Sequence, residues 1–552
     1  MTDRTPLRRR RAPTQHSAWL TALLGLASAP AIARAGGFEI PDTGARAAGR
    51  GGAMAVGVED LTAMHYNPGA LAKQRGTTIL YNQNLTFHRA SFTRVPLSAD
   101  VWGVDQTFGR VTDKKKLFPL GLFAVVGTDF GLKNWTFAAG IYGPSAVGHH
   151  DYPNYGPQSF QLTKMNILLA YYNVSAAWKW KDFFGIGATI QYVDLVQMKY
   201  SLVVDGAASD DLHPVPDSSE GSTQLRTDLK LKDHTAATAI LGLWYRPHRR
   251  VELGVSSRII PVFLKAKGGV STDKPTLLTG SARVELPLVL PANLRAGIRY
   301  IHEVTKGDKT RRWFDLELDV VYENWKAVPS FDLKFDGTIS GMPIGTVKVP
   351  KKWKDTVSVR FGGDFIALPP YLTVRAGGYF ETPTQDPEYS HLDFPAFMRG
   401  GIGGGLTAGA KGAYFTLGYM HVFQQTRSIS EAQAQVFQQR PLAPCPDECD
   451  GLSGVPANAG TFRSSFDLLN LGIELRFAEL LAGRKQKKAK QKEARPAAPA
   501  AAPAATPSAA ATAPGDDTSQ PATSDDASTD APADADPPRE SETVDPAAAP
   551  QE

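Results

Sequence analysis

The chain has 552 residues, of which 42% are hydrophobic, and its mean hydropathy is −0.23. No run of about 20 apolar residues follows the N-terminal region, which excludes transmembrane helices but not a membrane β-barrel, where only alternate residues of each strand face lipid. Basic residues cluster near both ends of the chain, and no basic face with interleaved aromatic residues accompanies the net charge of +5, which argues against nucleic-acid binding.

Residues 1–35 have the pattern of a secretory signal peptide. Arg8–Arg11 supply a positively charged start, and residues 18–29 form an apolar stretch that is too short to span a bilayer. Ala33-Arg34-Ala35 fits the small-x-small cleavage rule, so the mature chain is predicted to start at Gly36. The arginine run also raises the twin-arginine route, but the rest of that motif is missing, which favours general secretion.

Residues 76–477 form a series of alternating segments. In the segment 355–366, for example, Val357, Val359 and Phe361 alternate with Ser358 and Arg360. A period of two predicts β-strands. In a soluble sandwich the apolar face would be buried, whereas in a membrane barrel it meets lipid and the polar face meets the lumen.

The connections between these segments favour the barrel. Short turns such as 181–182, 247–249 and 368–370 alternate with long polar loops such as 203–223, 265–279, 339–351 and 425–461, which is the pattern of outer-membrane barrels. The sequence therefore predicts an all-β, 14-stranded antiparallel transmembrane β-barrel. Its expected strands are 76–92, 116–128, 134–143, 162–180, 183–202, 224–246, 250–264, 280–300, 312–338, 352–366, 371–382, 398–409, 413–424 and 462–477.

The last predicted strand ends on Phe477, and its alternation resembles the sorting signal of bacterial outer-membrane barrels; an ordinary amphipathic strand is the alternative. Residues 478–552 continue past this end, first Lys-rich and then rich in Ala, Pro and Asp. Such a composition cannot bury a core, so we predict a disordered tail in the periplasm. The predicted location of the protein is the bacterial outer membrane.

The chain has two cysteines, Cys445 and Cys449, and in an exported protein they are expected to form a local disulfide. A metal site at this pair is the weaker hypothesis, because two thiols and some carboxylates make no standard site. His149-His150-Asp151 is interpreted as a solvated loop in preference to a metal site. The sequence predicts no metal and no cofactor.

The start of the mature chain carries motifs that are similar to those of a known family. It contains Gly36-Gly37-Phe38-Glu39-Ile40, a Gly/Ala-rich stretch at 44–53, and Asp60 to Leu71 with Asn67-Pro68-Gly69 in its middle. This resembles the outer-membrane long-chain fatty-acid transporters of the FadL type. Further similar stretches follow in the family's order at 140–144, 286–297, 322–325, 353–355 and 375–379.

The resemblance implies a hatch at 36–75 inside the barrel of 76–477. In the family this hatch carries an Asn-Pro-Ala motif, so the chain departs from it at Gly69. Pro68 fixes φ and favours an extended Asn67, which is also compatible with a plain turn before the first strand. Gly37, Phe38, Asn67, Pro68 and Gly69 are the candidate hatch and gating residues.

The resemblance also implies passive transport in three stages: capture by apolar extracellular loops, binding in the lumen, and sideways release beside a kinked third strand. Gly140, Tyr142, Gly143 and Pro144 are the candidates for this lateral opening, because Gly in a strand marks a bend and Pro removes a ladder donor. A strand that simply ends at a turn is the alternative. The implied partners are a hydrophobic ligand, outer-membrane lipid and lipopolysaccharide, and the barrel-assembly machinery, for a monomeric protein.

A fatty-acid carboxylate needs a cation in the lumen, and Arg can hold it with two parallel bonds. By alternation, five arginines are predicted to point inward: Arg295, Arg299, Arg360, Arg375 and Arg399. Asp315, Glu317 and Asp319 are predicted to face inward on the next strand, which favours structural ion pairs as the role of Arg295 and Arg299.

A lipid hydrolase and a general porin are the two alternative functions, and the substrate class also stays open. A lipid hydrolase is disfavoured because the chain has neither Gly-x-Ser-x-Gly nor His-Glu-x-x-His, so no enzyme is predicted. A general porin would have a wide lumen without an N-terminal hatch. Aromatic hydrocarbons are also substrates within the resembled family, and the residues do not separate alkyl chains from rings.

Overall fold

The computed structural model describes residues 40–144, 148–207, 211–344, 346–442 and 454–482. Within these ranges no helix has the length and apolarity needed to cross a membrane. The predicted signal peptide, Gly37, Phe38, Cys445, Cys449 and the tail from residue 483 lie outside the described residues.

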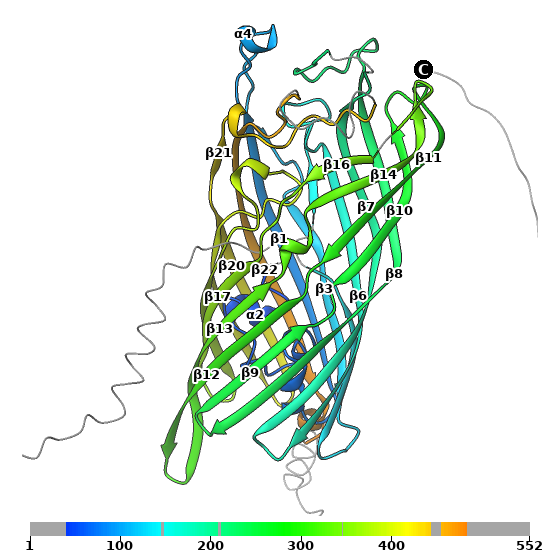
Figure 1. Ribbon diagram of the computed structural model, residues 1–552. Helices are drawn as coiled ribbons and strands as arrows, with labels where there is room; N and C mark the ends of the chain where they lie inside the picture. The colour runs from blue at the N-terminus through cyan, green and yellow to red at the C-terminus, as the bar shows by residue number, and fades with distance from the viewer. Residues whose placement is uncertain (1–39, 145–147, 208–210, 345, 443–453, 483–552) are drawn as a thin grey trace, which may run out of the picture. The chain divides into compact units, whose positions relative to one another are not determined.

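Fourteen antiparallel strands close into a barrel, which confirms the predicted fold class (Figure 1). Each strand pairs with the next one around the barrel, and the first strand pairs with the last from Thr78↔Arg476 to Arg94↔Gly460. The strands are β1 (Thr78–Arg94), β3 (Leu117–Thr128), β4 (Trp135–Tyr142), β6 (Lys164–Trp180), β7 (Phe184–Asp205), β8 (Gln224–His248), β9 (Val251–Arg258), β12 (Asn293–Lys306), β13 (Lys309–Glu323), β17 (Thr356–Leu368), β18 (Leu372–Glu381), β19 (Arg399–Ala410), β20 (Ala413–Gln424) and β22 (Gly460–Arg476).

Five further strands extend the barrel wall on one side, beyond the 14 strands that close the ring. They are β10 (Val262–Thr272), β11 (Leu278–Leu290), β14 (Ser330–Ile339), β15 (Met342–Pro343) and β16 (Thr346–Pro350). β10 pairs with β8 and β11, and β14 pairs with β11 and β16. The expectation of long loops at 265–279 and 339–351 was therefore wrong in part. Their polar, charged outer face led to the loop assignment, yet this pattern is also that of a strand surrounded by water.

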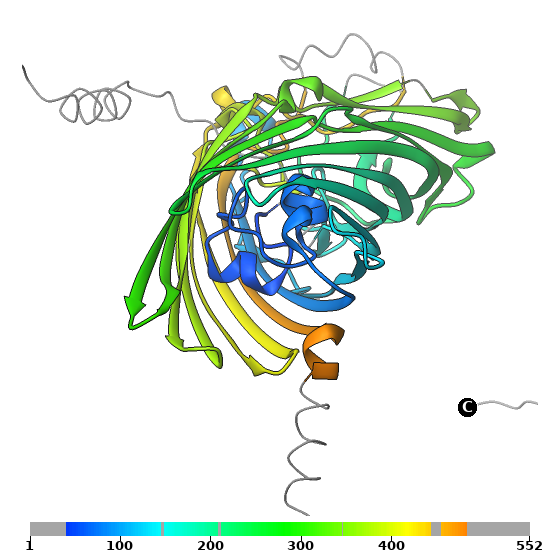
Figure 2. The same ribbon diagram turned by 90° about the horizontal axis from the view of Figure 1, so that it is seen from below.

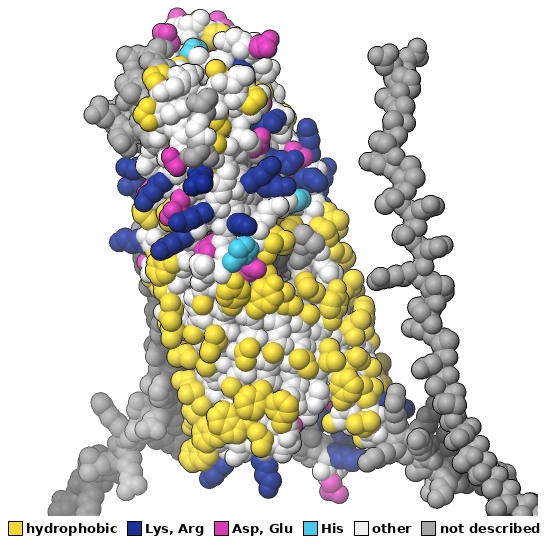
Figure 3. Space-filling view, turned by 90° about the vertical axis from the view of Figure 1, so that its right-hand side faces the viewer, with side chains coloured by type: hydrophobic (Ala, Val, Ile, Leu, Met, Phe, Trp, Pro, Cys, Tyr) yellow, Lys and Arg dark blue, Asp and Glu magenta, His cyan; other side chains and the backbone are white. Residues whose placement is uncertain are grey.

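The outward face changes character along the strands. Figure 3 shows a wide band of hydrophobic side chains near one end and charged side chains directly above it. In β8 the lumen-facing residues are Ile240 and Trp244 in the band but Leu229 and Leu231 above it, because irregular pairing with β7 shifts the register between the two parts. A shift by one residue exchanges the two faces of a strand. The inward set of β8 therefore changes from even-numbered residues in the band to odd-numbered residues above it.

The remaining short elements lie in the long loops at the end farther from the hydrophobic band (Figure 1). They are β2 (Val111–Thr112), β5 (His149–Asp151), β21 (Arg427–Ile429), α4 (Ala99–Trp102), η2 (Trp325–Ala327), η3 (Pro387–Tyr389) and η4 (Glu431–Gln433). The opposite end has short turns. In an outer-membrane barrel the long loops are extracellular and the short turns periplasmic.

The N-terminal segment fills the barrel. It contains α2 (Ala45–Gly49), α3 (Ala63–Tyr66) and η1 (Pro68–Lys73), and Figure 2 shows these elements inside the ring of strands. Nearly all of its residues are buried. This segment, residues 40–77, is called the hatch below. At the other end of the barrel sequence, the Phe477 backbone N–H donates to the carbonyl of Thr77, which closes the last strand against the first.

Candidate functional site

Arg50 anchors the hatch to the barrel wall. Its Nη1 lies 2.9 Å from Oδ1 of Asp315 and 2.6 Å from Oδ1 of Asp364, and its Nη2 lies 2.6 Å from Oε2 of Glu317. All four side chains are buried, and the Arg50 Nε donates to the carbonyl of Ala53. Such charge-assisted, multiply bonded contacts fix position and orientation together.

The inward acidic row of β13 also holds the hatch backbone. Glu317 accepts hydrogen bonds from the N–H groups of Val56 and Gly57, at 2.7 and 2.8 Å. Asp319 accepts from those of Met54 and Ala55, at 2.7 and 2.8 Å. Alternation predicted that these carboxylates face the lumen. That they bind the hatch backbone depends on contacts between residues more than 250 positions apart.

The Asn67-Pro68-Gly69 motif ties the hatch to β8. The Asn67 side-chain amide donates to the carbonyls of Ala55 (2.7 Å) and Leu243 (2.9 Å), and its Oδ1 accepts from the Gly69 N–H (3.0 Å). Pro68 begins η1, where the missing N–H costs nothing. A Cβ on Gly69 would lie 2.6 Å from the carbonyl oxygen of Gly242, so this close approach explains the glycine at the third position.

The described pairing along the third strand of the barrel has a gap after Tyr142. β4 pairs with β3 and β6 up to Tyr142, and the next described residue that pairs with β6 is His149 of β5, opposite Asn166. Between them, a Cβ on Gly143 would lie 2.4 Å from the carbonyl oxygen of Leu169. Gly140 lies inside the ladder, where a Cβ would lie 2.4 Å from the carbonyl oxygen of Ala124.

A small cavity lies where the hatch meets this interruption. The hatch contributes Ile40, Pro41, Thr43, His65 and Tyr66, the third strand contributes Tyr142, Gly143 and Pro144, and the facing wall contributes Tyr171, Arg295, Glu323 and Arg360. The structure therefore brings together residues predicted separately as lateral opening and as carboxylate contacts. We call this cavity the lumen pocket.

The lumen pocket contains the charged side chains of Arg295, Arg360 and Glu323. Burial, together with the positive charges of Arg295, Arg258 and Arg360, holds the pKa of His65 well below its ordinary value. His65 belongs to the hatch, outside the membrane-spanning strands, and is therefore neutral at physiological pH. Arg295 Nη1 donates to the His65 carbonyl at 3.2 Å, and its guanidinium lies 5.8 Å from the centre of the Tyr66 ring.

The other predicted arginines are held by carboxylates elsewhere. Arg299 lies 2.8 Å from Asp315 and 3.1 Å from Glu252, Arg375 lies 3.2 Å from Asp364, and Arg399 lies 2.5 Å from Glu381. Structural pairing thus holds for Arg299, as expected. Arg295 lies further along the same strand and lines the lumen pocket together with Glu323.

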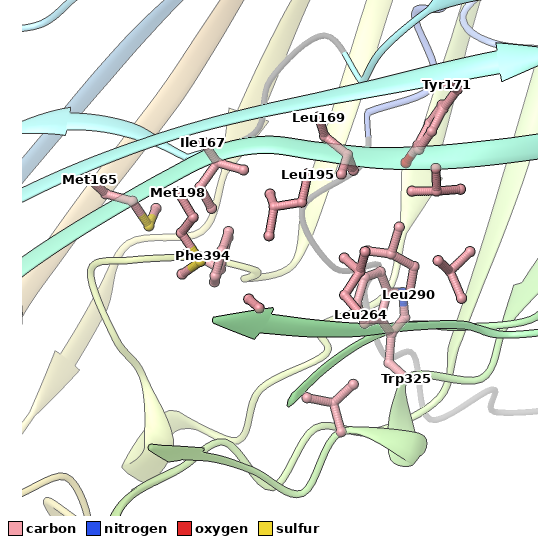
Figure 4. Packing of buried hydrophobic residues seen from close by; sticks show 14 of the residues in the cluster. Met165, Ile167, Leu169, Tyr171, Leu195, Met198, Leu264, Leu290, Trp325 and Phe394 are labelled. Carbon is pink, nitrogen blue, oxygen red and sulfur yellow. The ribbon is translucent and has the colours of Figure 1, made fainter. Parts of the chain in front are cut away.

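Apolar side chains line the lumen from this pocket towards the long loops. Figure 4 shows Met165, Ile167, Leu169 and Tyr171 in a row along β6, with Leu195 and Met198 of the neighbouring strand beside them. Leu264, Leu290, Trp325 and Phe394 belong to the same buried cluster (Figure 4). The row on β6 ends at Tyr171, which is also part of the lumen pocket wall.

A second cavity lies in the strand extension near the long loops. Its walls come from β7, β8, β10, β11, β14 and β16, and they are almost entirely aliphatic or aromatic, including Leu202, Leu229, Val270, Phe335 and Val347. We call it the upper pocket. Sequence alternation did not find it, because the register shifts in β7 and β8 reverse which residues face inward.

His88, Asp113 and His150 form the one group, in the described part of the chain, whose ligand atoms lie close enough to hold a metal ion, all within 4.8 Å. His150 is buried, and its Nδ1 lies 2.7 Å from Oδ2 of Asp113. The expectation of a solvated loop was therefore wrong for His150, because Asp113 from a distant loop covers it. Hydrogen bonds from the N–H groups of Lys115 and Asp151 to Asp113 already account for the position of this carboxylate.

The sequence-based prediction missed His65, Tyr66, Tyr171 and Glu323 as pocket residues. The alternation of β6 places Tyr171 inward and was a usable signal. The sequence carried no signal that places His65 and Tyr66 in the pocket, because the short helix α3 within the hatch decides where their side chains point.

Comparisons with known proteins agree with this architecture. The family model described as outer membrane protein transport protein (OMPP1/FadL/TodX) matches residues 26–443. No curated protein matches the chain. The structure of a FadL homologue from Pseudomonas aeruginosa is 14% identical, covers 81% of this chain and 100% of its own, and has a TM-score of 0.60.

Two structures of toluene transporters are also similar. TbuX of Ralstonia pickettii is 13% identical, covers 80% of this chain and 99% of its own, and has a TM-score of 0.55. TodX of P. putida is 14% identical, covers 78% and 97%, and has a TM-score of 0.53. At these identities the likeness establishes the fold.

Proposed function

Because the chain belongs to the OMPP1/FadL/TodX family of outer membrane transport proteins, we propose that its hydrophobic cargo carries a carboxylate, and that long-chain fatty acids are its substrates. The protein is a transporter of hydrophobic compounds in the bacterial outer membrane and not an enzyme. The single observation that supports the finer proposal is the lumen pocket, where Arg295 and Arg360 meet the end of an apolar lining.

The proposed route begins at the upper pocket, whose apolar walls bind an alkyl chain. The ligand then follows the apolar lining along β6 to the lumen pocket, where a buried carboxylate gains charge-assisted hydrogen bonds from Arg295 and Arg360. A neutral hydrocarbon would gain no charge-assisted hydrogen bond from these two side chains. Transport is passive, since binding affinity and concentration suffice to drive it.

Exit is proposed to occur sideways beside Gly143 and Pro144, which line both the lumen pocket and the interruption of the third strand. Movement of the hatch, anchored next to the same pocket, would open the way. Support for this step comes from the position of the interruption, level with the bound carboxylate. The C-terminal tail is proposed to lie in the periplasm, because β22 ends at the short-turn end of the barrel.

The first experiment compares binding of oleate and methyl oleate to the purified protein. The proposal predicts tight binding of oleate, a loss of roughly tenfold or more in Arg360→Gln and Arg295→Gln, and little change for methyl oleate. Arg311→Gln, at an exposed site near a periplasmic turn, is the matched control. Equal binding of oleate and its ester by the wild type would instead favour aromatic or other neutral hydrocarbons.

The second experiment measures uptake of labelled oleate by cells that lack the gene and by cells in which it is restored. Pro144→Trp, which fills the interruption, should lower uptake while the purified variant still binds oleate. Pro343→Trp, at an exposed site on the short strand β15, is the control. Normal uptake by folded Pro144→Trp would rule out the lateral route and leave lumen binding intact.

A further inference from the structure

Five lysines gather on the outer surface of the barrel, just above the hydrophobic band. Lys199 lies on β7, Lys230 and Lys232 on β8, and Lys265 and Lys267 on β10. They point outward, since their sequence neighbours Met198, Tyr200, Leu229, Leu231, Leu264 and Ala266 are buried in the lumen. Figure 3 shows Lys and Arg gathered above the band on the face that includes these strands.

The pairing of these strands places like charges side by side. Lys199 lies opposite Lys230, and Lys232 lies opposite Lys267. Like charges directly opposite one another destabilise a sheet. Within the patch the ion pair recorded is that of Lys267 with Glu285, at 3.0 Å.

The ladders beyond β11 in the same sheet show the opposite arrangement. Between β11 and β14, Glu285 lies opposite Lys334 and Arg283 lies opposite Asp336. Between β14 and β16, Asp332 lies opposite Lys348. One part of the sheet thus balances its own charges, whereas the lysine patch on β7, β8 and β10 leaves an excess of positive charge for an external anion.

The position of the lysine patch relative to the hydrophobic band indicates which anion it would bind. On β10 the outward residues run Phe263, Lys265, Lys267, so the positive charge begins one outward position above an exposed aromatic side chain of the hydrophobic band. That position is about 7 Å along a strand and lies at the level of lipid headgroups on the long-loop side. The extracellular leaflet of an outer membrane is built of phosphorylated glycolipid.

We propose that Lys199, Lys230, Lys232, Lys265 and Lys267 form a binding site for the phosphate groups of the lipopolysaccharide that surrounds the barrel. Phosphate oxygens accept strong hydrogen bonds from ammonium groups and remove the repulsion between paired lysines. Anionic headgroups attract each lysine near the membrane surface, so several neighbouring lysines together make a site of useful affinity. The inference concerns the barrel exterior and does not depend on which ligand crosses the lumen.

The test measures retention of purified bisphosphorylated lipid A by the full-length protein in detergent, by native mass spectrometry. Lys230→Gln/Lys232→Gln should weaken binding by roughly tenfold or more, whereas the wild type should bind the dephosphorylated glycolipid poorly. Lys306→Gln/Lys309→Gln is the matched control, because these two lysines also face each other but at a periplasmic hairpin. Heat-modifiable migration on gels confirms that each variant is folded.

A second readout is the thermal midpoint. Lipid A should raise the Tm of the wild type and of the control, and raise that of Lys230→Gln/Lys232→Gln by clearly less. Equal retention by both double variants would overturn the proposal. So would an equal response to phosphatidylglycerol or inorganic phosphate, because the patch would then be a general anion site and not one for the glycolipid.

Discussion

The Tyr142 hydroxyl, on the last residue of β4, lies 3.3 Å from Nδ1 of His65 in the hatch. The same oxygen accepts a hydrogen bond from the Gln191 side chain at 2.9 Å. Neutral His65 can accept a hydrogen bond from the Tyr142 hydroxyl at Nδ1. One contact therefore joins the hatch to the interrupted strand, at the wall of the lumen pocket.

Tyr142→Phe removes this contact and keeps the ring. A buried hydrogen bond contributes about 1 kcal/mol, so we expect bound oleate to dissociate several-fold faster and the hatch to move more readily. Stopped-flow displacement of a fluorescent fatty acid measures the rate. Tyr300→Phe, on an outward-facing ring, should leave the rate unchanged; an unchanged rate in Tyr142→Phe as well would show that the contact does not restrain the hatch.

Arg50→Gln should loosen the hatch. Loss of the guanidinium leaves Asp315, Glu317 and Asp364 with fewer cations in a buried site, at a cost of about 3–5 kcal/mol. The expected result is ion conductance in planar bilayers, where the plugged wild type should be nearly silent. Arg46→Gln, whose contact with Asp60 is longer at 3.6 Å, should conduct far less. A silent Arg50→Gln would mean that other contacts suffice to hold the hatch.

Gly69→Ala tests why this chain departs from the family's Asn-Pro-Ala motif. The added methyl group would lie 2.6 Å from the Gly242 carbonyl oxygen, so strand or hatch must shift, at about 1–3 kcal/mol. We expect a lower thermal midpoint and greater protease sensitivity of the hatch. Gly109→Ala is the control, since nothing lies within 4 Å of its added Cβ. A midpoint equal to that of the control would contradict the close approach.

A buried ion pair in the long loops should make their stability depend on pH. Lys351 Nζ lies 2.5 Å from Asp393 Oδ2, and His391 Nδ1 lies 2.8 Å from Asp393 Oδ1. Burial opposes the charge of Asp393, but its contacts with His391 and Lys351 prevail and hold the pKa of its carboxyl well below the ordinary value. A carboxyl with a lowered pKa stabilises the folded state above its unfolded pKa of about 4, and this contribution is lost as the pH falls further.

Hydrogen exchange of the loop 382–398 measures this effect. The wild type should lose protection progressively below about pH 4, whereas Asp393→Asn should have low protection already at pH 7. Asp386→Asn breaks the more exposed ion pair with Lys354 and should change protection little. Identical protection in the wild type and Asp393→Asn would show that packing alone holds these loops.

Much of the fold follows from local sequence. The period-two pattern, the alternation of short turns with long loops, and the closing strand at Phe477 predicted a barrel of 14 strands, and segments such as 371–382 match β18 (Leu372–Glu381) within a residue. The predicted strands 280–300 and 312–338 were wrong in extent, because each spans two strands, β11 with β12 and β13 with β14. The strands can be predicted because contact with lipid requires an apolar outer face on every strand, so the alternating pattern is present in the sequence of each strand. Where water replaces lipid, as at β10 and β16, the local signal was lost and strands were taken for loops.

The sequence by itself determined the barrel, the inward direction of its arginines and carboxylates, and the resemblance of the hatch. The tertiary structure decided which of them form the lumen pocket. Arg295 and Arg299 lie on one face of one strand, yet Arg299 contacts Asp315, Glu252 and Glu59 while Arg295 lines the pocket with Tyr142 and His65. Their neighbours come from the hatch and from distant strands, and register shifts reverse the faces of β7 and β8. Closure of the barrel brings these groups together, and the local alternation of residues does not specify which strands lie opposite one another across the lumen.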